Sequence, residues 1–282
     1  MNNIIYIYII IFIILIFYNY KNEQFISDKN INVYAIYHFY KNTDPYYSNN
    51  RVYNKIPLIA FTCWHSKELL YNMYHNMIKN ISNNPEIDFY IYDNDNAIDF
   101  IKNNFDISVL DAYNKLIPDS YKSDLLRYCL LYINGGIYLD IKFKFTIPII
   151  KLIAKYQSIF VKDFNHCDNA TLTGFIITEP KNPIFLDCIK QIIYNIENDI
   201  YGDNSLFPTG PCLLGSITKK YNNIFKLKMH KSFNNSDNYV ITDYYNEDDI
   251  LLIPYFQYRN EQKILQNNIH YSKLWDNKNI YY

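Results

Sequence analysis

The sequence predicts an α/β protein built on a sheet whose faces are covered. Between residues 58 and 220, short apolar segments of strand length alternate with longer segments whose apolar residues recur at helical spacing. This alternation is typical of strands and helices that pack in layers. The chain has 282 residues, which leaves room for one domain of about 230 residues behind an apolar N-terminal run.

The predicted elements follow one another along the chain. Strands are predicted at 58–63 and 88–93, and helices at 67–80, 94–103 and 109–116. Asn94 or Asp95 is available to cap the helix that begins at residue 94. A helix at 121–133 and a strand at 137–139 come next, followed by strands at 159–162 and 175–178 and helices at 183–196 and 211–220.

An apolar run at the N-terminus predicts a membrane anchor over residues 1–20. From Ile4 to Tyr18 every residue is apolar or aromatic, and with its flanks the run reaches about 30 Å as a helix, enough to cross a bilayer. The small residues of a signal-peptide cleavage site are missing. We therefore expect a single-pass membrane protein of the secretory pathway, of the ER or Golgi type. An uncleaved leader and a buried helix are the alternatives.

The orientation of this anchor stays open. Lys21 follows the apolar run and no basic residue precedes it, which leans against a lumenal domain under the positive-inside rule. Residues 21–55 are polar, rich in tyrosine and without a clear period, and we interpret them as a stem. Residues 56–282 then form the expected folded domain. With 27 basic and 28 acidic residues, the chain offers no field that would attract nucleic acid.

The five cysteines show neither a Cys-x-x-Cys pair nor the spacing of a zinc site. Cys63 and Cys129 fall at positions expected to be buried and are interpreted as inert thiols. An odd count leaves the redox compartment unresolved.

The segment from Ser123 to Lys144 places three charged residues around one tight turn. In the predicted helix, Leu125, Tyr128, Cys129 and Tyr132 form an apolar stripe of period 3.6. Asp124 and Arg127 are three residues apart on another face, so one ligand can reach both. Gly135 and Gly136, two of only six glycines, follow the helix and indicate positive φ or a close backbone approach. Asp140 ends the short strand, where open α/β sheets bind ligands.

These residues resemble the sugar-nucleotide-binding core of glycosyltransferase family 32. That family includes fungal α-mannosyltransferases and sphingolipid mannosyltransferases, and the large glucosylating toxins of clostridia resemble it more distantly. Its members share a Ser-Asp-x-x-Arg-Tyr helix, a Gly-Gly-x-Tyr-x-Asp turn and strand, and an Asp-x-Asp motif. Further similar segments cover the strand from Ile56 to Trp64, the helix entry Thr209-Gly210-Pro211, and the segment from His270 to Trp275.

The resemblance implies a GT-A type nucleotide-diphospho-sugar transferase fold, with a mixed, mostly parallel central sheet flanked by helices. It also implies a hexosyltransferase that uses a UDP- or GDP-sugar and a glycan, lipid or protein acceptor, with retention of configuration. The expected catalytic residues are Asp124, Arg127, Asp140 and Lys142. The expected nucleotide-sugar-binding residues are Trp64, Asp124, Arg127, Gly135, Gly136, Tyr138, Thr209, Gly210 and Trp275.

A divalent cation, Mn²⁺ or Mg²⁺, is the cofactor that the resemblance implies, with Asp140 and His270 as its expected ligands. The chain departs from the family at this point, because Asp140-Ile141-Lys142 stands where the family has Asp-x-Asp. An ammonium about 4 Å from a dication is repelled by roughly 8 kcal/mol at an effective dielectric near 20. Either Lys142 turns aside, or it replaces the metal as the counter-charge of the phosphate, or the site is inactive. Lys142 and Lys144 also fit a solvated strand edge.

Asp93 and Asp95 allow two interpretations. Asp93 and Asp95 have the spacing of a metal pair, but they also fit helix caps at a junction between strand and helix.

The rival function is a membrane-anchored pseudoenzyme that binds a nucleotide sugar or a glycan without turnover, and Lys142 is the residue that favours it.

Overall fold

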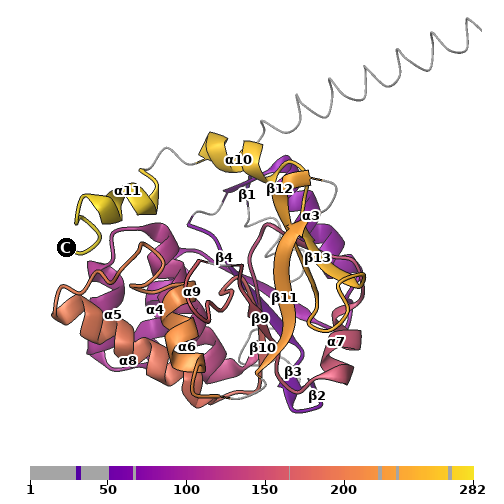
Figure 1. The fold of residues 1–282 in the computed structure, drawn as a ribbon, viewed down its shortest axis with the longest axis horizontal. Coiled ribbons are helices and arrows are strands. Elements are labelled where there is room, and N and C mark those ends of the chain that lie inside the picture. Colours follow the sequence, from indigo (N-terminus) through magenta and orange to yellow (C-terminus); the bar gives the residue numbers. More distant parts are fainter. Residues whose placement is uncertain are drawn as a thin grey trace, which may run out of the picture.

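The computed structural model describes residues 30–32, 51–65, 68–164, 166–221, 224–232, 235–265 and 269–282. These residues form a mixed α/β fold in which two sheets pack against each other and a group of helices covers the other face of one sheet (Figure 1). The α/β class predicted from the sequence is confirmed.

The central sheet has four strands in the order β10-β7-β4-β6. Strand β4 pairs in parallel with both β6 and β7, and β10 adds an antiparallel edge to β7. These strands are β4 (Ile59–Cys63), β6 (Asp88–Tyr92), β7 (Gly136–Leu139) and β10 (Phe175–Thr178). All four match strands that the sequence predicts.

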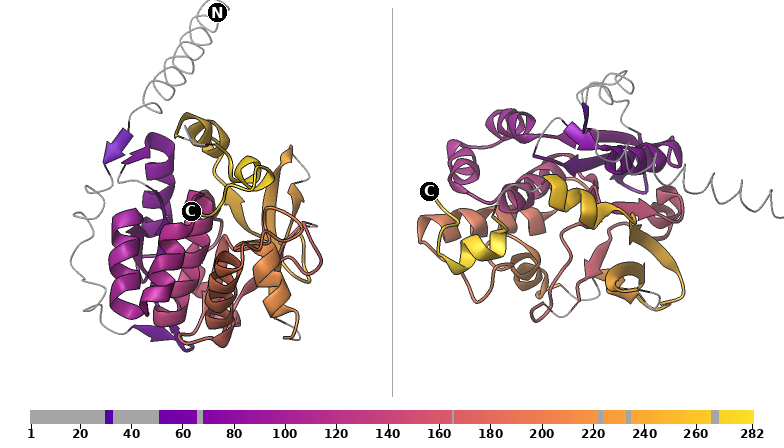
Figure 2. Two further views of the ribbon diagram at one scale, coloured as in Figure 1. Left: turned by 90° about the vertical axis from the view of Figure 1, so that its left-hand side faces the viewer. Right: turned by 90° about the horizontal axis from the view of Figure 1, so that it is seen from above.

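Helices cover one face of the central sheet. Phe61, Tyr138 and Ile176, one from each of three strands, are buried in the same apolar cluster as residues of these helices. The helices are α4 (Asn94–Asn104), α5 (Ile107–Lys115), α6 (Asp119–Asn134), α8 (Pro183–Glu197) and α9 (Pro211–Thr218). Figure 2 shows them as one layer beside the sheet.

A second sheet, rather than further helices, covers most of the other face. It has the order β8-β13-β12-β11-β9, and Leu227 and Ile241 of this sheet are buried with Ala60 and Ile137 of the central sheet. Its strands are β8 (Phe143–Phe145), β9 (Phe160–Lys162), β11 (Phe225–Ser232), β12 (Asn235–Asp243) and β13 (Ile250–Pro254). Helix α7 (Ile149–Lys155) adds residues to the same cluster.

Two details of the predicted elements are wrong. The helix expected from residue 67 begins at Tyr71, because β5 (Glu68–Leu70) is extended and pairs with β1 (Asn30–Asn32). Neither Asn94 nor Asp95 caps α4. The cap is Asp93, whose carboxylate accepts a hydrogen bond from the backbone N–H of Asn96. This agrees with the interpretation of Asp93 as a helix cap rather than a metal ligand.

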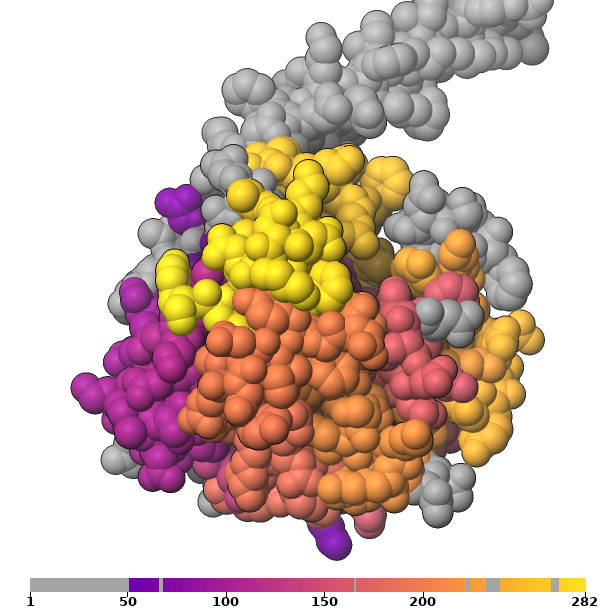
Figure 3. Space-filling view, turned by 60° about the vertical axis from the view of Figure 1, so that its left-hand side comes forward, coloured from indigo at the N-terminus to yellow at the C-terminus, as the bar shows by residue number. Residues whose placement is uncertain are grey.

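The C-terminal segment lies over the first half of the chain. Helix α10 (Tyr258–Leu265) lies near α3 (Tyr71–Ser82), and α11 (Tyr271–Asp276) follows it. Tyr282 donates its backbone N–H to Lys115, and Ile117 donates to Ile280. In Figure 3 the yellow C-terminal residues sit against the orange and purple segments. A two-stranded ribbon, β2 (Val52–Tyr53) with β3 (Ile56–Pro57), precedes β4.

The predicted anchor at 1–20 lies outside the described residues, as does most of the predicted stem. Among the helices that the structure describes, none has the length and hydrophobicity of a membrane span.

Candidate active site

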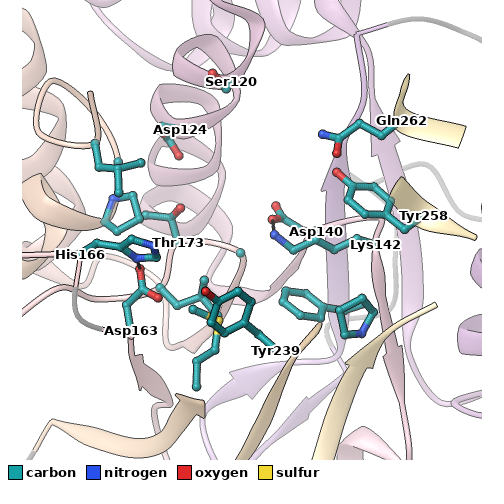
Figure 4. A pocket seen from close by; sticks show the side chains of 18 of the residues that line it. Ser120, Asp124, Asp140, Lys142, Asp163, His166, Thr173, Tyr239, Tyr258 and Gln262 are labelled. Carbon is teal, nitrogen blue, oxygen red and sulfur yellow. Dashed lines mark hydrogen bonds and ion pairs between the residues drawn. The ribbon is translucent and has the colours of Figure 1, made fainter. Parts of the chain in front are cut away.

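The segment predicted as the site borders a cavity of about 360 Å³. The cavity lies where the start of α6, the end of β7, the loop after β9, the start of α9 and helix α10 meet (Figure 4). Its lining includes Asp124, Arg127, Asp140 and Lys142, the four residues predicted to be catalytic. We call these four residues the helix wall.

Asp124 lies on α6 and is buried. Its carboxylate accepts a hydrogen bond from the Thr209 hydroxyl, with 2.8 Å between Oγ1 and Oδ2. Burial raises the pKa of the Asp124 carboxyl, and Arg127 and the Thr209 hydroxyl partly oppose this shift. A Cβ at Gly210 would lie 3.2 Å from the same carboxylate oxygen. Thr209 and Gly210, both predicted as binding residues, therefore shape the surroundings of Asp124.

Arg127 joins the two acidic residues of the helix wall. Its Nη2 lies 3.3 Å from Oδ1 of Asp124, and its Nη1 lies 3.6 Å from Oδ1 of Asp140. The guanidinium carbon is 4.4 Å from the centre of the Tyr138 ring, a cation–π contact. Its Nε donates to the backbone carbonyl of Ser123, which fixes the side chain along the helix. The structure thus brings Asp124, Arg127, Tyr138 and Asp140 together, as predicted.

Asp140 and Lys142 form an ion pair at the cavity. Lys142 Nζ lies 3.0 Å from Oδ2 of Asp140. The two residues follow β7 in a turn, in which the N–H of Phe143 donates to the carbonyl of Asp140, so their shared direction does not come from a continuous strand. Burial acts to raise the pKa of Asp140, but Lys142 and Arg127 outweigh it and hold the pKa below its usual value. The same pair raises the pKa of Lys142 against the effect of burial.

The glycine pair lies behind the site rather than in its lining. Gly135 and Gly136 have φ values of 63° and 84°, in the region that favours glycine. A Cβ at Gly136 would lie 2.6 Å from the carbonyl oxygen of Ile59, and one at Gly135 would lie 2.5 Å from the backbone of Pro180. The pair therefore makes the tight turn that leads α6 into β7. Direct binding of the nucleotide sugar by these glycines stays a prediction.

Neither tryptophan belongs to the lining of the cavity. The Trp64 indole N–H donates to the carbonyl of Glu68, and its ring packs 4.6 Å from that of His65. The Trp275 indole N–H donates to the carbonyl of Tyr201, and Lys278 lies over its ring. Base stacking by Trp64 and lid formation by Trp275 stay predictions.

His270 does line the cavity. Its Nδ1 accepts a hydrogen bond from the backbone N–H of Ser272 and caps the first turn of α11. Burial, Arg259 and Lys273 lower the pKa of His270. The structure explains its position as a helix cap next to the cavity.

Two further residues border the cavity from the loop after β9, and the sequence analysis missed them. Asp163 is buried, and its Oδ2 lies 3.0 Å from Nδ1 of His166. The hydrogen bond that the protonated His166 ring donates to the Asp163 carboxylate raises the pKa of His166. A disulfide between Cys167 and Cys212 ties this loop to α9. We call Asp163 and His166 the loop wall, and Figure 4 shows it across the cavity from Asp140 and Lys142.

A signal for the loop wall was present in the sequence. Asp163 comes directly after the correctly predicted strand at 159–162, and polar residues at strand ends often serve a site. The disulfide had no comparable signal, because five cysteines allow many pairings.

Helix α10 forms the rim of the cavity and was not predicted. Tyr258, Arg259 and Gln262 line the cavity from this helix. On another side of α10, the buried Glu261 accepts hydrogen bonds from the backbone N–H groups of Asn72 and Met73, in the first turn of α3. Its carboxylate also accepts a hydrogen bond from the Tyr255 hydroxyl. Glu261 thus supplies the cap that α3 lacks locally, and it fixes the rim to α3.

The residues around Asp140 do not fit the expected divalent cation. Lys142 lies against one carboxylate oxygen and Arg127 lies near the other, so a dication there would meet two cations. Among the described residues, no three side chains of His, Cys, Asp or Glu gather as a metal site.

Part of the chain is similar to a known protein family. Residues 71–159 match the family model described as a glycosyltransferase sugar-binding region containing a DXD motif. The match covers α3 to α7, including the helix wall, and it confirms the resemblance on which the sequence analysis relied.

The chain also resembles individual proteins. It is 31% identical over 108 residues to the uncharacterized glycosyltransferase L373 of Acanthamoeba polyphaga mimivirus. That alignment covers 38% of this chain and 43% of the relative, so the chain spans less than half the length of this relative. A solved structure, the PaToxG glycosyltransferase, aligns with a TM-score of 0.46 and 17% identity, over 59% of this chain and 70% of that one.

Proposed function

We propose, from the premise that residues 71–159 carry a glycosyltransferase sugar-binding region, that this protein is a glycosyltransferase with a GT-A type fold. In this proposal it moves a hexose from a UDP- or GDP-sugar to a glycan, lipid or protein acceptor, with retention of configuration. The observation that carries the proposal is the convergence of Asp124, Arg127 and Asp140 on one cavity of about 360 Å³. This volume lies within the usual range of small-molecule sites, roughly 300–1,000 Å³.

The proposed roles follow from charge and position. Asp124 accepts hydrogen bonds from hydroxyl groups of the sugar, because its carboxylate oxygens are acceptors at the cavity surface. Arg127 bridges the sugar and the phosphate, since a guanidinium donates to several acceptors at once. Trp64 remains the candidate for stacking on the base, which would then extend beyond the cavity.

The proposed reaction transfers the hexose from the diphosphate to the acceptor oxygen. The acceptor oxygen bonds to the anomeric carbon of the hexose, while the bond from that carbon to the diphosphate oxygen breaks. The electron pair of the broken bond stays on the diphosphate, and the acceptor proton passes to a phosphate oxygen. The chain assists by stabilising the negative charge that develops on the leaving diphosphate, which is usually a large contribution to catalysis. We propose no carboxylate nucleophile.

The proposed location is a membrane of the secretory pathway, with the apolar N-terminal run as a single-pass anchor. The disulfide between Cys167 and Cys212 supports an oxidising compartment for the folded domain. The lumenal side of such a membrane provides that environment.

A donor screen tests the proposed function. The full chain in neutral detergent is incubated with UDP- and GDP-sugars, and release of the nucleoside diphosphate is measured with and without acceptor glycans. We expect release from one donor, reduced about tenfold or more in Asp140→Asn, because a charge-assisted hydrogen bond is lost. Binding without release under every condition would favour the pseudoenzyme, a rival that the comparisons do not support.

A further inference from the structure

We propose that Lys142 takes the place of a divalent cation, so that the cavity binds the donor's diphosphate without metal. The inference rests on the proposed function and assigns the counter-charge within that site. In the matched family the motif is Asp-x-Asp, whereas this chain has Lys142 at the second acidic position.

The ammonium of Lys142 is held at the cavity. It lies 3.0 Å from Oδ2 of Asp140 and 4.9 Å from the centre of the Phe143 ring. Its side chain keeps 27% of its exposure, and the residue lines the cavity rather than an outer surface. An ammonium has three donors and the carboxylate uses one, so donors remain for phosphate oxygens.

Both carboxylate oxygens of Asp140 already have cationic neighbours. Lys142 pairs with one of its oxygens, and Arg127 Nη1 lies 3.6 Å from the other. A Cβ at Gly174 would lie 2.5 Å from Oδ2 of Asp140, so the glycine allows the carboxylate to sit where Lys142 reaches it. The carboxylate that would bind a metal in an Asp-x-Asp site here positions an ammonium instead.

The other acidic residues of the cavity are also engaged. Asp124 contacts Arg127 and Thr209, and Asp163 contacts His166. Hard divalent cations require several oxygen ligands, and each carboxylate near this position already has a donor. The formal charges of the helix wall sum to zero, with two carboxylates, one guanidinium and one ammonium. A diphosphate that enters gains Lys142 and, at the rim, Arg259 as cationic partners.

The test measures the affinity of UDP and of GDP for the full chain by calorimetry, once in EDTA and once in Mn²⁺. We expect the affinity of the bound nucleotide to be equal within about twofold in the two conditions. Lys142→Met should weaken it about tenfold in both, because a charged donor to phosphate is lost. Lys142→Asp, which restores the Asp-x-Asp motif, should bind weakly in EDTA and recover with Mn²⁺. Mn²⁺ retained by the nucleotide complex of this variant is measured separately by electron paramagnetic resonance.

Lys144 provides the matched control. It lies two residues further along on β8 and borders a different cavity, with Asn72 and His75. Lys144→Met and Lys144→Asp make the same changes of charge and should leave nucleotide affinity unchanged in both conditions. Circular dichroism checks the fold of each variant. If Lys142→Asp does not fold, Lys142→Arg serves with Lys142→Met, since arginine keeps the charge and should keep most of the affinity.

Three results would overturn the inference. These are a wild-type affinity that falls about tenfold in EDTA, a Lys142→Met variant that binds as tightly as wild type, and an equal loss in the Lys144 variants. If the wild type binds neither UDP nor GDP in either condition, the proposed function fails together with the inference.

Discussion

The two walls of the cavity are built in different ways. The helix wall consists of four charged residues between positions 124 and 142, joined by Arg127 and Lys142 into one network of opposite charges. The loop wall is one Asp163–His166 pair on a loop that a disulfide ties to α9. His166 keeps 41% of its side-chain exposure, whereas Arg127 keeps 6%. In the proposed function, the buried helix wall binds the donor, and the more accessible loop wall leaves room for the acceptor.

The largest effect should come from breaking the helix wall. Arg127→Met leaves two carboxylates close together without the cation between them, and we expect a loss of about 3–5 kcal/mol in the free energy of unfolding. Urea unfolding measures this loss. The matched control is Arg51→Met, which removes an exposed pair with Asp88 and should cost about 1 kcal/mol or less. Equal unfolding midpoints for the two variants would show that the buried network contributes no more than a surface pair.

The next effect should come from releasing the loop wall. Replacing both Cys167 and Cys212 with Ala removes a cross-link between residues 45 apart. We expect a loss of about 2–4 kcal/mol in unfolding free energy, because the unfolded chain is less restricted. Thermal unfolding with and without reductant measures it, and reductant should lower the stability of the wild type but not that of the double variant. The free Cys129, buried in the helix layer, gives the control Cys129→Ala, which keeps the disulfide and should lose as much stability in reductant as the wild type does.

The smallest effect should come from the charge within the loop wall. Asp163 raises the pKa of His166, so this pair adds stability below the unfolded pKa of histidine and loses it as the pH rises through the folded value. Because His166 is partly exposed, the contribution should stay below about 1 kcal/mol.

The variant Asp163→Asn sharpens this point. A histidine titration followed by nuclear magnetic resonance should show a lower pKa for His166 in the variant than in the wild type. The pKa of His270, which is lowered by burial and by Arg259 and Lys273, should not change. If the pKa of His166 is the same in the variant and the wild type, Asp163 and His166 are not electrostatically coupled.

The same contrast explains how much the sequence could predict. The helix wall lies in one segment, where helical spacing, two adjacent glycines and a strand end are all visible, so Asp124, Arg127 and Asp140 were found together. Lys142 was found from the resemblance, because it stands at the second position of the Asp-x-Asp motif. The strands and most helices of the central sheet were also found, because each has its own periodicity.

The remaining parts depend on contacts between distant segments. Leu252 of β13 pairs with Phe145 of β8, across more than a hundred residues, and no local pattern selects that partner. The strand Glu68–Leu70 was taken for helix because its apolar residues continue the helical spacing of α3, while its pairing with β1 is a tertiary contact. The loop wall likewise depends on a disulfide that spacing alone could not assign.

The hydrogen bonds between Glu261 and the start of α3 limit the routes by which a ligand can enter the cavity. If α10 swung outward as a hinged gate, the Glu261 carboxylate would leave the backbone N–H groups of Asn72 and Met73 and the Tyr255 hydroxyl. Each of those donors would then lose its partner, and the first turn of α3 would lose its cap. The α10 side of the cavity therefore stays in place, and a ligand enters and leaves the cavity by another side.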